Sequence, residues 1–334
     1  MVLNSHYANF LFQGRGILNF MWTGVYLFFV ITGFLFARYI LYKDFEFLPY
    51  AIRRFFRIYP LYIFSLFIYY FITQNGPHKI YYFIKHIFFL NTITCSKNEV
   101  FFFNPAYWSL PVEIEFYLVV PILAFIRKRF TVKLLLYLFP IFFLAKFLLA
   151  LNASQNPLNI PAVIGIHIPG MMPEFSVGIL LYVVYENFLK GKTIRFAYQL
   201  LIFLSGIGIL SLLCTFFVLY GDEGINQNLI MRAFFSTFCA FGYALIILSC
   251  LLFFRDKQLK ASNIFLFIGS ISYGMYLFHN IFPRFTDRLG LHIHKGFAYF
   301  IYSVTVFLIA LLCNRFIENP LRNFGRKIAL KFSK

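Results

Sequence analysis

Residues 2–12 read VLNSHYANFLF, residues 24–36 read GVYLFFVITGFLF and residues 53–60 read RRFFRIYP. Apolar runs therefore alternate with short polar links from the start of the chain. The first run contains one imidazole, His6, and the third stretch contains paired arginines next to apolar sequence. Ionisable side chains are rare within membrane segments and usually have a function there. This opening indicates a membrane protein that holds a polar site.

The composition of the whole chain agrees with this interpretation. Its 334 residues are 61% hydrophobic and 22% aromatic, and only 13% are charged, which is typical of a polytopic helical membrane protein. A formal net charge of +18 would favour nucleic-acid binding in a soluble chain, but here the basic residues lie mainly in short links between apolar runs. Such links are typical of cytoplasmic loops that face anionic lipid, so we expect no nucleic-acid partner.

Apolar runs that suit membrane crossings recur along the chain. A crossing helix needs about 20 apolar residues to span a core of about 30 Å. The first run, 1–13, is too short for this, and 80–94 is short and carries Lys85 and His86. The longer candidates are 17–42, 58–73, 106–126, 134–151, 171–189, 197–220, 229–254, 264–283 and 297–317.

Loop charge decides how these runs alternate across the membrane. Five segments carry 20 of the 30 Lys and Arg residues, and they share one side only if 1–13 crosses and 80–94 does not. We therefore predict an all-α bundle of about ten crossings, a re-entrant or interfacial helix at 80–94 on the outer side, and both termini in the cytoplasm. The outer links 152–170 and 221–228 contain no Lys or Arg, as expected. The five basic segments are 43–57, 127–133, 186–195, 255–260 and 315–334.

The domain organisation follows from the same runs. No internal repeat or low-complexity linker is visible, and little sequence follows the last candidate crossing. We therefore expect residues 1–334 to form a single membrane domain without an appended soluble domain.

His6 is a candidate general base. A neutral imidazole can take a proton from a hydroxyl nucleophile near neutral pH. The alternative is that His6 forms a hydrogen bond to a neighbouring helix.

Arg53, Arg54 and Arg57 lie where the chain re-enters the membrane from the predicted cytoplasmic side. Arg54 and Arg57 are three residues apart and share a helical face, which suits bidentate contacts to phosphate. The alternative is that these arginines only anchor the helix according to the positive-inside rule.

Carboxylates at the outer ends of two predicted crossings are also candidates. Glu113 and Glu115 follow Trp108, an interfacial type of residue, and point in different directions because they are two apart. Glu174 stands alone at the mouth of a later crossing. Lys146 is its best internal partner, or it extends its amine to the membrane surface instead.

The segment GSISYGMYLFHNIFP (Gly269 to Pro283) places small polar residues on a helix, with Tyr273 inside it and His279 near its outer end. Its polar residues lie on no single i, i+3 ladder, so they form no self-contained catalytic triad. Packing through Gly and Ser is the alternative. His292 and His294 have no further ligand nearby in sequence, so we expect no metal site.

Taken in order, six stretches resemble motifs of the integral-membrane acyltransferase family three. They read GVYLFFVITGFLF, RRFFRIYPLY, WSLPVEIEFY, PEFSVG, SYGMYLFH and IENPLR, and together they span essentially the whole chain. The resemblance implies transfer of an acyl group, usually acetyl, from cytoplasmic acyl-coenzyme A to a hydroxyl of a surface or secreted carbohydrate. It also implies a multi-pass protein of the inner (plasma) membrane that holds no permanently bound cofactor.

The resemblance assigns roles to the candidate residues. His6 matches the catalytic histidine of the family by its position before GVYLFF, and Glu113 is expected to orient it or the acceptor. Binding of acyl-coenzyme A phosphates is assigned to Arg54, Arg57 and Arg53. Substrate contacts are expected from Trp108, Glu174, Tyr273 and His279.

Two departures from the family pattern stand out. The family has an Arg eleven residues before its His, a position that falls ahead of Met1, and Arg15 cannot replace it by counting. Tyr26 stands where the family commonly has Asp. We expect an upstream extension that supplies this Arg. The alternatives to an active enzyme are a catalytically dead relative and a transporter or flippase for lipid-linked sugars.

Overall fold

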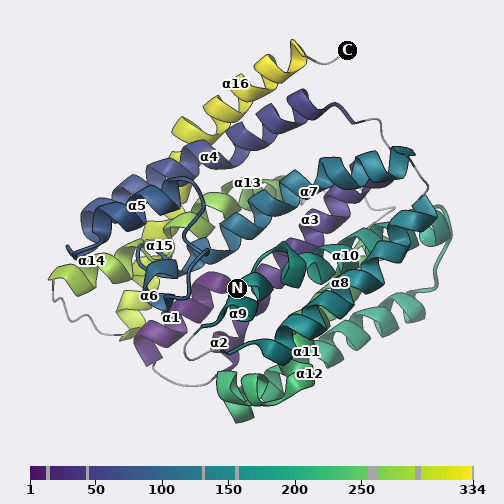
Figure 1. Ribbon diagram of the computed structural model, residues 1–334, viewed down its shortest axis with the longest axis horizontal. Helices are drawn as coiled ribbons and strands as arrows, with labels where there is room; N and C mark the ends of the chain where they lie inside the picture. Colours follow the sequence, from purple (N-terminus) through teal and green to yellow (C-terminus); the bar gives the residue numbers. More distant parts are fainter. Residues whose placement is uncertain are drawn as a thin grey trace. The chain divides into compact units, whose positions relative to one another are not determined.

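The computed structural model describes residues 1–12, 16–42, 45–129, 132–154, 158–254, 262–289 and 295–332. Its elements are helices throughout (Figure 1), which confirms the all-α prediction. Arg15, His292 and His294 lie outside the described residues.

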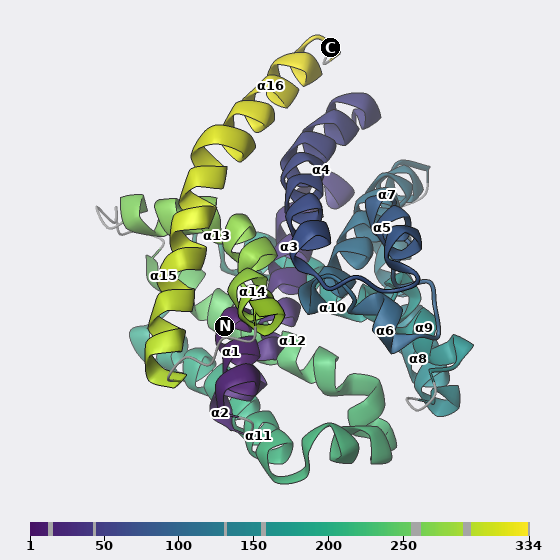
Figure 2. The ribbon, with the colours of Figure 1, turned by 90° about the vertical axis from the view of Figure 1, so that its left-hand side faces the viewer.

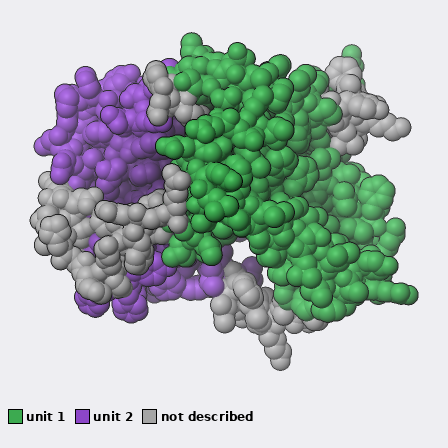
Figure 3. Space-filling model, turned by 90° about the horizontal axis from the view of Figure 1, so that it is seen from below, with its two compact units in different colours: residues 1–2, 15–44, 112–260 green, residues 3–14, 45–111, 261–334 purple. Residues whose placement is uncertain are grey.

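The chain separates into two compact units, which Figure 3 shows in different colours. Unit 1 comprises residues 1–2, 15–44 and 112–260, and unit 2 comprises residues 3–14, 45–111 and 261–334. The units therefore alternate along the sequence instead of following one another, so they are not two successive domains. The single-domain organisation stays a prediction.

Most of the long helices of unit 1 pack against α10, whose contacts include α3, α8 and α12. Helix α7 (Ser109–Arg129) starts in unit 2 and runs within unit 1 from Val112 onward. The other elements of unit 1 are α2 (Ile17–Phe20), η1 (Met21–Thr23), α3 (Gly24–Leu41), α8 (Val132–Asn152), α9 (Ile160–Gly165), α10 (Ile168–Val184), the π-helical turn η3 (Tyr185–Leu189), α11 (Phe196–Gln227) and α12 (Leu229–Phe254).

Unit 2 contains two helix pairs that matter for the site. Helices α4 and α16 pack together, and α13 packs against α15 (Figure 1). Its elements are α1 (Val2–Phe12, in this unit from Leu3), α4 (Phe47–Ile72), α5 (Lys79–Ile87), α6 (Lys97–Val100), η2 (Pro105–Trp108), α13 (Ser262–Phe278), α14 (Ile281–Leu289), α15 (Lys295–Cys313), the π-helical turn η4 (Asn314–Glu318) and α16 (Asn319–Leu330).

Seven helical segments in the described part of the chain are long and apolar enough to cross a membrane. The protein is therefore a multi-pass membrane protein, while the figure of about ten crossings stays a prediction. Where 80–94 was expected to be a short non-crossing piece, the structure has the nine-residue helix α5. The spanning segments are Ile17–Leu41, Phe47–Ile72, Pro105–Arg129, Ile160–Leu189, Phe196–Gln227, Leu229–Phe254 and Phe297–Leu330.

Glycines allow α3 and α10 to approach closely in unit 1. A Cβ atom added to Gly33 would lie 2.1 Å from the carbonyl oxygen of Phe175, and one added to Gly178 would lie 2.1 Å from that of Val30. Only glycine fits at such backbone contacts, as in many membrane helix interfaces. These two glycines belong to the GVYLFFVITGFLF and PEFSVG stretches, so the contact explains part of both motifs and fixes the helix that carries Glu174.

Candidate functional site

Two histidines from distant parts of the sequence meet in unit 2. The ring of His6, on α1, lies against the ring of His279, which follows α13, with 4.9 Å between the ring centroids and 47° between the planes. Figure 2 shows α1 beside α14 and α15, in agreement with the packing of Tyr7 on Tyr302. His6, the predicted general base, and His279, a predicted substrate contact, are therefore in direct contact.

Hydrogen bonds engage both ring nitrogens of His279. Its Nδ1 lies 2.7 Å from the carbonyl oxygen of Tyr276, which can only accept, so Nδ1 carries the proton. Its Nε2 then accepts from the amide of Asn280 at 3.0 Å, and that amide also donates to the side-chain oxygen of Asn104 at 2.7 Å. His279 is fully buried and is therefore held as a neutral ring with no lone pair left for a substrate proton.

His6 differs from His279 in its hydrogen bonding. Among the described residues, none forms a hydrogen bond to the ring nitrogens of His6. Its neighbour Tyr7 is fixed, because the Tyr7 hydroxyl donates to the carbonyl oxygen of His279 at 2.8 Å. The backbone of α1 is thus tied to the chain segment that carries His279. The role of His6 as a general base stays a prediction.

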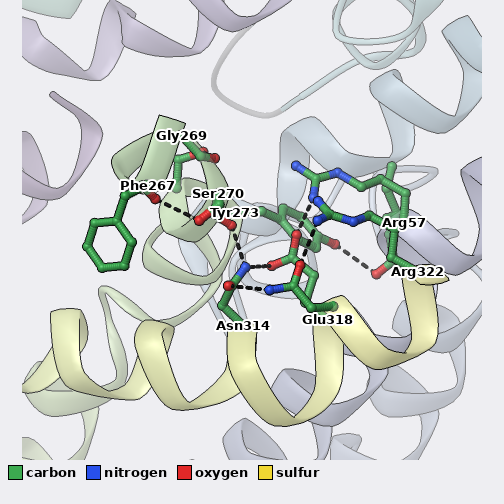
Figure 4. Close-up of polar contacts among 11 residues, drawn as sticks. Arg57, Phe267, Gly269, Ser270, Tyr273, Asn314, Glu318 and Arg322 are labelled. Carbon is green, nitrogen blue, oxygen red and sulfur yellow. Dashed lines mark hydrogen bonds and ion pairs between the residues drawn. The ribbon is translucent and has the colours of Figure 1, made fainter. Parts of the chain in front are cut away.

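A second cluster surrounds Arg57 on α4 (Figure 4). The Arg57 guanidinium forms an ion pair with the buried carboxylate of Glu318, at the end of η4. It also lies 6.0 Å from the centre of the Tyr273 ring, and the Tyr273 hydroxyl donates to the carbonyl oxygen of Ile58 at 3.0 Å. Tyr273 and His279, predicted together as substrate contacts, thus lie in different clusters.

The π-helical turn η4 shapes the side of this cluster opposite α4. The amide of Asn314 donates to the carbonyl oxygen of Ser270 at 2.6 Å and to Glu318 at 3.4 Å. Asn319 donates to the side-chain oxygen of Asn314 at 2.8 Å and accepts from Arg322 at 2.6 Å. Single π turns within α-helices often mark functional sites, because the wider turn redirects side chains. Here the turn presents Glu318 to Arg57.

The other two arginines lie on the same helix as Arg57. The structure places all three inside α4, which begins at Phe47, whereas the sequence suggested a link up to residue 57. Arg53 is exposed and its Nε donates to the carbonyl oxygen of Pro49 at 3.0 Å, while Arg54 is half-buried. Trp108, predicted to contact substrate, is half-buried at the end of η2.

Unit 1 contains a buried ion pair. Lys146 on α8 pairs with Glu174 on α10, which is one of the two alternatives that the sequence left open, and the two residues are 6% and 0% exposed. The Lys146 amine also donates to the Ser236 hydroxyl at 2.8 Å, and the Thr237 hydroxyl donates to Glu174 at 2.9 Å. Both hydroxyls lie on α12, so this network joins three helices.

Glu113 and Glu115 point to different partners, as their spacing predicted. Glu113 is buried and accepts a hydrogen bond from Tyr117, one turn further along α7. Glu115 contacts the ring of His167 and accepts from the backbone N–H of Ile168 at 2.9 Å, which caps the start of α10. Glu113 belongs to unit 1 and His6 to unit 2, so the expected role of Glu113 in orienting His6 stays a prediction.

Comparison with known proteins decides the family. A family model described as an acyltransferase domain, acyltransferase family three, matches residues 1–315. The chain belongs to this acyltransferase family. It is also 24% identical over 284 residues to "Putative acetyltransferase ORF330" of Acidianus two-tailed virus, which covers 83% of this chain and 78% of the viral protein. No solved structure matches the chain.

Within this acyltransferase, the residues that face Arg57 from η4 and α16 are not among the sequence candidates, and Glu318 is the one that pairs with Arg57. Glu318 lies in the stretch IENPLR, to which the sequence pattern assigns no site residue. The available signal was a lone carboxylate at the end of a membrane helix and within a basic segment, where a cation partner is needed. Nothing in the sequence identifies that partner as Arg57, 261 residues earlier.

The structure shows the surroundings of Tyr26, which stands where the family commonly has Asp. Tyr26 is buried in unit 1, with its ring edge-on to Trp22 at 5.5 Å between centroids. Both rings line a cavity of about 160 Å³ that Lys146 and Ser236 also line. The residue that replaces the commonly found Asp thus lies next to the buried ion pair and adds no charge to it.

Proposed function

We propose that this acyltransferase moves an acyl group, acetyl in the simplest case, from acyl-coenzyme A to a hydroxyl of an extracytoplasmic carbohydrate, with His6 as general base. Membership of the family supports acyl transfer, and the viral relative named as an acetyltransferase supports acetyl as the group. The observation that carries the role of His6 is its contact with a histidine whose two ring nitrogens are already engaged.

The reaction follows from this pair of rings. The acceptor hydroxyl gives its proton to a ring nitrogen of His6 while its oxygen attacks the thioester carbonyl carbon. The tetrahedral intermediate collapses with cleavage of the carbon–sulfur bond, and the leaving coenzyme A thiolate takes the proton back from His6. The products are a carbohydrate ester and free coenzyme A, and His6 is neutral again. His279 keeps its proton and serves as a fixed wall for the His6 ring.

The donor end lies at the Arg57 cluster in this proposal. Arg57 and Arg322 approach Glu318 together, so two cations face one carboxylate and a net positive charge remains. Guanidinium groups suit the phosphates of acyl-coenzyme A, with Arg54 and Arg53 on the same helix. Tyr273 contacts Arg57 and is therefore assigned to the donor.

Topology separates the two substrates. With about ten crossings and both termini in the cytoplasm, the α4 arginines face acyl-coenzyme A, and the carbohydrate approaches from the other side of the plasma membrane. Trp108, Glu174 and His279 remain assigned to the acceptor side, and Glu113 to orientation of His6 or the acceptor. Residues 1–334 act as one membrane domain.

The test uses protein purified in lipid nanodiscs. Release of coenzyme A thiol from acetyl-coenzyme A is followed with and without polysaccharide extracted from the host cell. A general base contributes roughly 10²–10⁴-fold, so His6→Ala should lower polysaccharide-dependent release by at least about a hundredfold. His86→Gln, at another buried histidine of unit 2, is the matched control and should retain the rate.

The outcomes separate the alternatives. Equal rates for wild type and His6→Ala would exclude His6 as the base. A wild-type protein that binds acetyl-coenzyme A without turnover would identify a dead relative. Movement of a lipid-linked sugar without consumption of acetyl-coenzyme A would identify a transporter.

A further inference from the structure

Unit 2 contains a groove that none of the roles above uses. Its volume is about 730 Å³, within the range of roughly 300–1,000 Å³ typical of small-molecule sites. The end of α4, the loop that leads to α5, helix α6 and helix α14 form its walls, and α4 packs against both α5 and α14. Polar and basic side chains supply much of the lining: Gln74, Asn75, His78, Lys97, Asn98 and Arg284.

The charged side chains in the described lining of the groove, Lys97 and Arg284, are both basic. No Asp or Glu is among the described residues that form its wall. Arg284 is positioned by a hydrogen bond from its guanidinium to the carbonyl oxygen of Phe101 at 3.1 Å. The carboxylate of α6, Glu99, is buried and pairs with Lys85 instead. The groove therefore favours an anion.

Its other side chains suit a sugar. The amides of Gln74, Asn75 and Asn98 can both donate to and accept from hydroxyl groups. The rings of Tyr82 and Phe102, 4.9 Å apart between centroids, add apolar surface to the same wall. Hydroxyl-bonding amides beside aromatic rings match the mixed polar and apolar faces of a saccharide.

The groove adjoins the histidine pair along the chain. Arg284 lies in the first turn of α14, where its backbone N–H donates to the carbonyl oxygen of Asn280 at 3.2 Å. Asn280 in turn donates to His279, whose ring lies against His6. His279 and Asn280 form the turn between α13 and α14, so Arg284 follows the histidine pair after one short turn and the first residues of α14. A chain of a few sugar rings in the groove can therefore extend toward His6.

We propose that this groove binds the acceptor and that the acceptor is an anionic saccharide, with a carboxylate or phosphate held by Lys97 and Arg284. This inference rests on the proposed function, because it identifies the class of carbohydrate that receives the acyl group. Carboxylate and phosphate offer the same anionic oxygens, so probes of both kinds distinguish them.

The test measures binding without turnover, on the full chain in nanodiscs. The probes are fluorescently labelled trigalacturonate, labelled maltotriose as its neutral counterpart, and labelled maltotriose phosphate. An anionic probe should bind at least tenfold more tightly than maltotriose, and its Kd should rise with salt. Equal affinity for all three probes, or affinity that salt does not change, would overturn the proposal without any variant.

Variants then locate the site. Lys97→Gln and Arg284→Gln should each weaken binding of the anionic probe about tenfold, while Arg284→Lys should retain most of it. Lys190→Gln, at an exposed lysine of unit 1 on the predicted cytoplasmic side, is the matched control. Unchanged affinity in both groove variants would overturn the proposal. Lys97 is exposed, so its replacement tests the groove even if the Arg284 variants fold poorly.

This design also separates the groove from the proposed reaction. Charge-dependent binding in a protein that never consumes acetyl-coenzyme A would retain the groove and refute the acyl transfer. Transfer to a neutral glycan at a rate that Lys97→Gln and Arg284→Gln leave unchanged would retain the reaction and refute the groove.

Discussion

Replacement of Lys146 by Met should destabilise the protein strongly. Lys146 and Glu174 are 6% and 0% exposed and form an ion pair, and the Lys146 amine also donates to Ser236. In the variant, Glu174 keeps only the hydrogen bond from Thr237 among the described residues, because its second oxygen, Oε2, has no hydrogen-bond partner there. The substitution therefore leaves a buried carboxylate without its cation.

The expected magnitude follows from this geometry. Breaking a buried ion pair by removing one partner costs about 3–5 kcal/mol. Lys146→Met should therefore lower the free energy of unfolding by about 3–5 kcal/mol. The double variant Lys146→Met/Glu174→Gln removes both charges and leaves only altered hydrogen bonds, which cost about 1–2 kcal/mol in total. The double variant should therefore regain about 2–3 kcal/mol of the stability that Lys146→Met loses.

The assay is a double-mutant cycle on thermal unfolding, measured in one detergent at neutral pH. The four proteins are the wild type, Lys146→Met, Glu174→Gln and the double variant. Lys146→Met should unfold at a lower temperature than the double variant, which should regain most of the loss. If Lys146→Met unfolds within about 1 kcal/mol of the wild type, or if the two losses simply add, the pair does not stabilise unit 1 as described.

Three further predictions concern other parts of the molecule. Arg57→Gln should weaken acyl-coenzyme A binding by at least about tenfold in calorimetry, since a charge-assisted contact is worth about 1.5–3 kcal/mol. Equal affinity to the control Lys190→Gln would reduce Arg57 to a helix anchor. Gly33→Ala should abolish the peak of folded protein in size-exclusion chromatography, because the added Cβ would lie 2.1 Å from the backbone oxygen of Phe175. The control Gly208→Ala, whose Cβ would have nothing within 4 Å, should elute like the wild type. Normal folding of Gly33→Ala would contradict the close contact. Burial lowers the pKa of His86 to about 4 from its usual value near 6.5. Between these two pH values the unfolded chain binds more protons than the folded chain, so the free energy of unfolding falls as the pH drops. The expected loss is about 3 kcal/mol at 1.36 kcal/mol per pKa unit. His86→Gln should remove that part of the pH dependence of the unfolding temperature, and an unchanged pH profile would show that His86 does not cause it.

Composition and periodicity were sufficient for the helical membrane fold, and they offered the pairing of Glu174 with Lys146 as one of two alternatives. A carboxylate and an amine within apolar helices each need a counter-charge, and few candidates exist in such a chain. The short helix α5 was also predictable, because a run that contains Lys85 and His86 is too polar and too short to cross.

Contacts between distant segments were not predictable in the same way. His6 and His279 are separated by most of the chain, and helical periodicity relates only residues within one helix. The link between Arg57 and Glu318 was missed for the same reason, and the separation of Tyr273 from His279 depends on where α13 ends. The motifs supplied the residues, and the fold was needed to group them.

The most direct test of the central claim is the ester-linked acetate of host surface polysaccharide in cells that lack this gene. Cells complemented with the wild-type gene should recover the acetate, and cells complemented with His6→Ala at equal protein level should remain at the level of the deletion strain. Full recovery with His6→Ala would contradict the account, because no other described residue is assigned to take the acceptor proton.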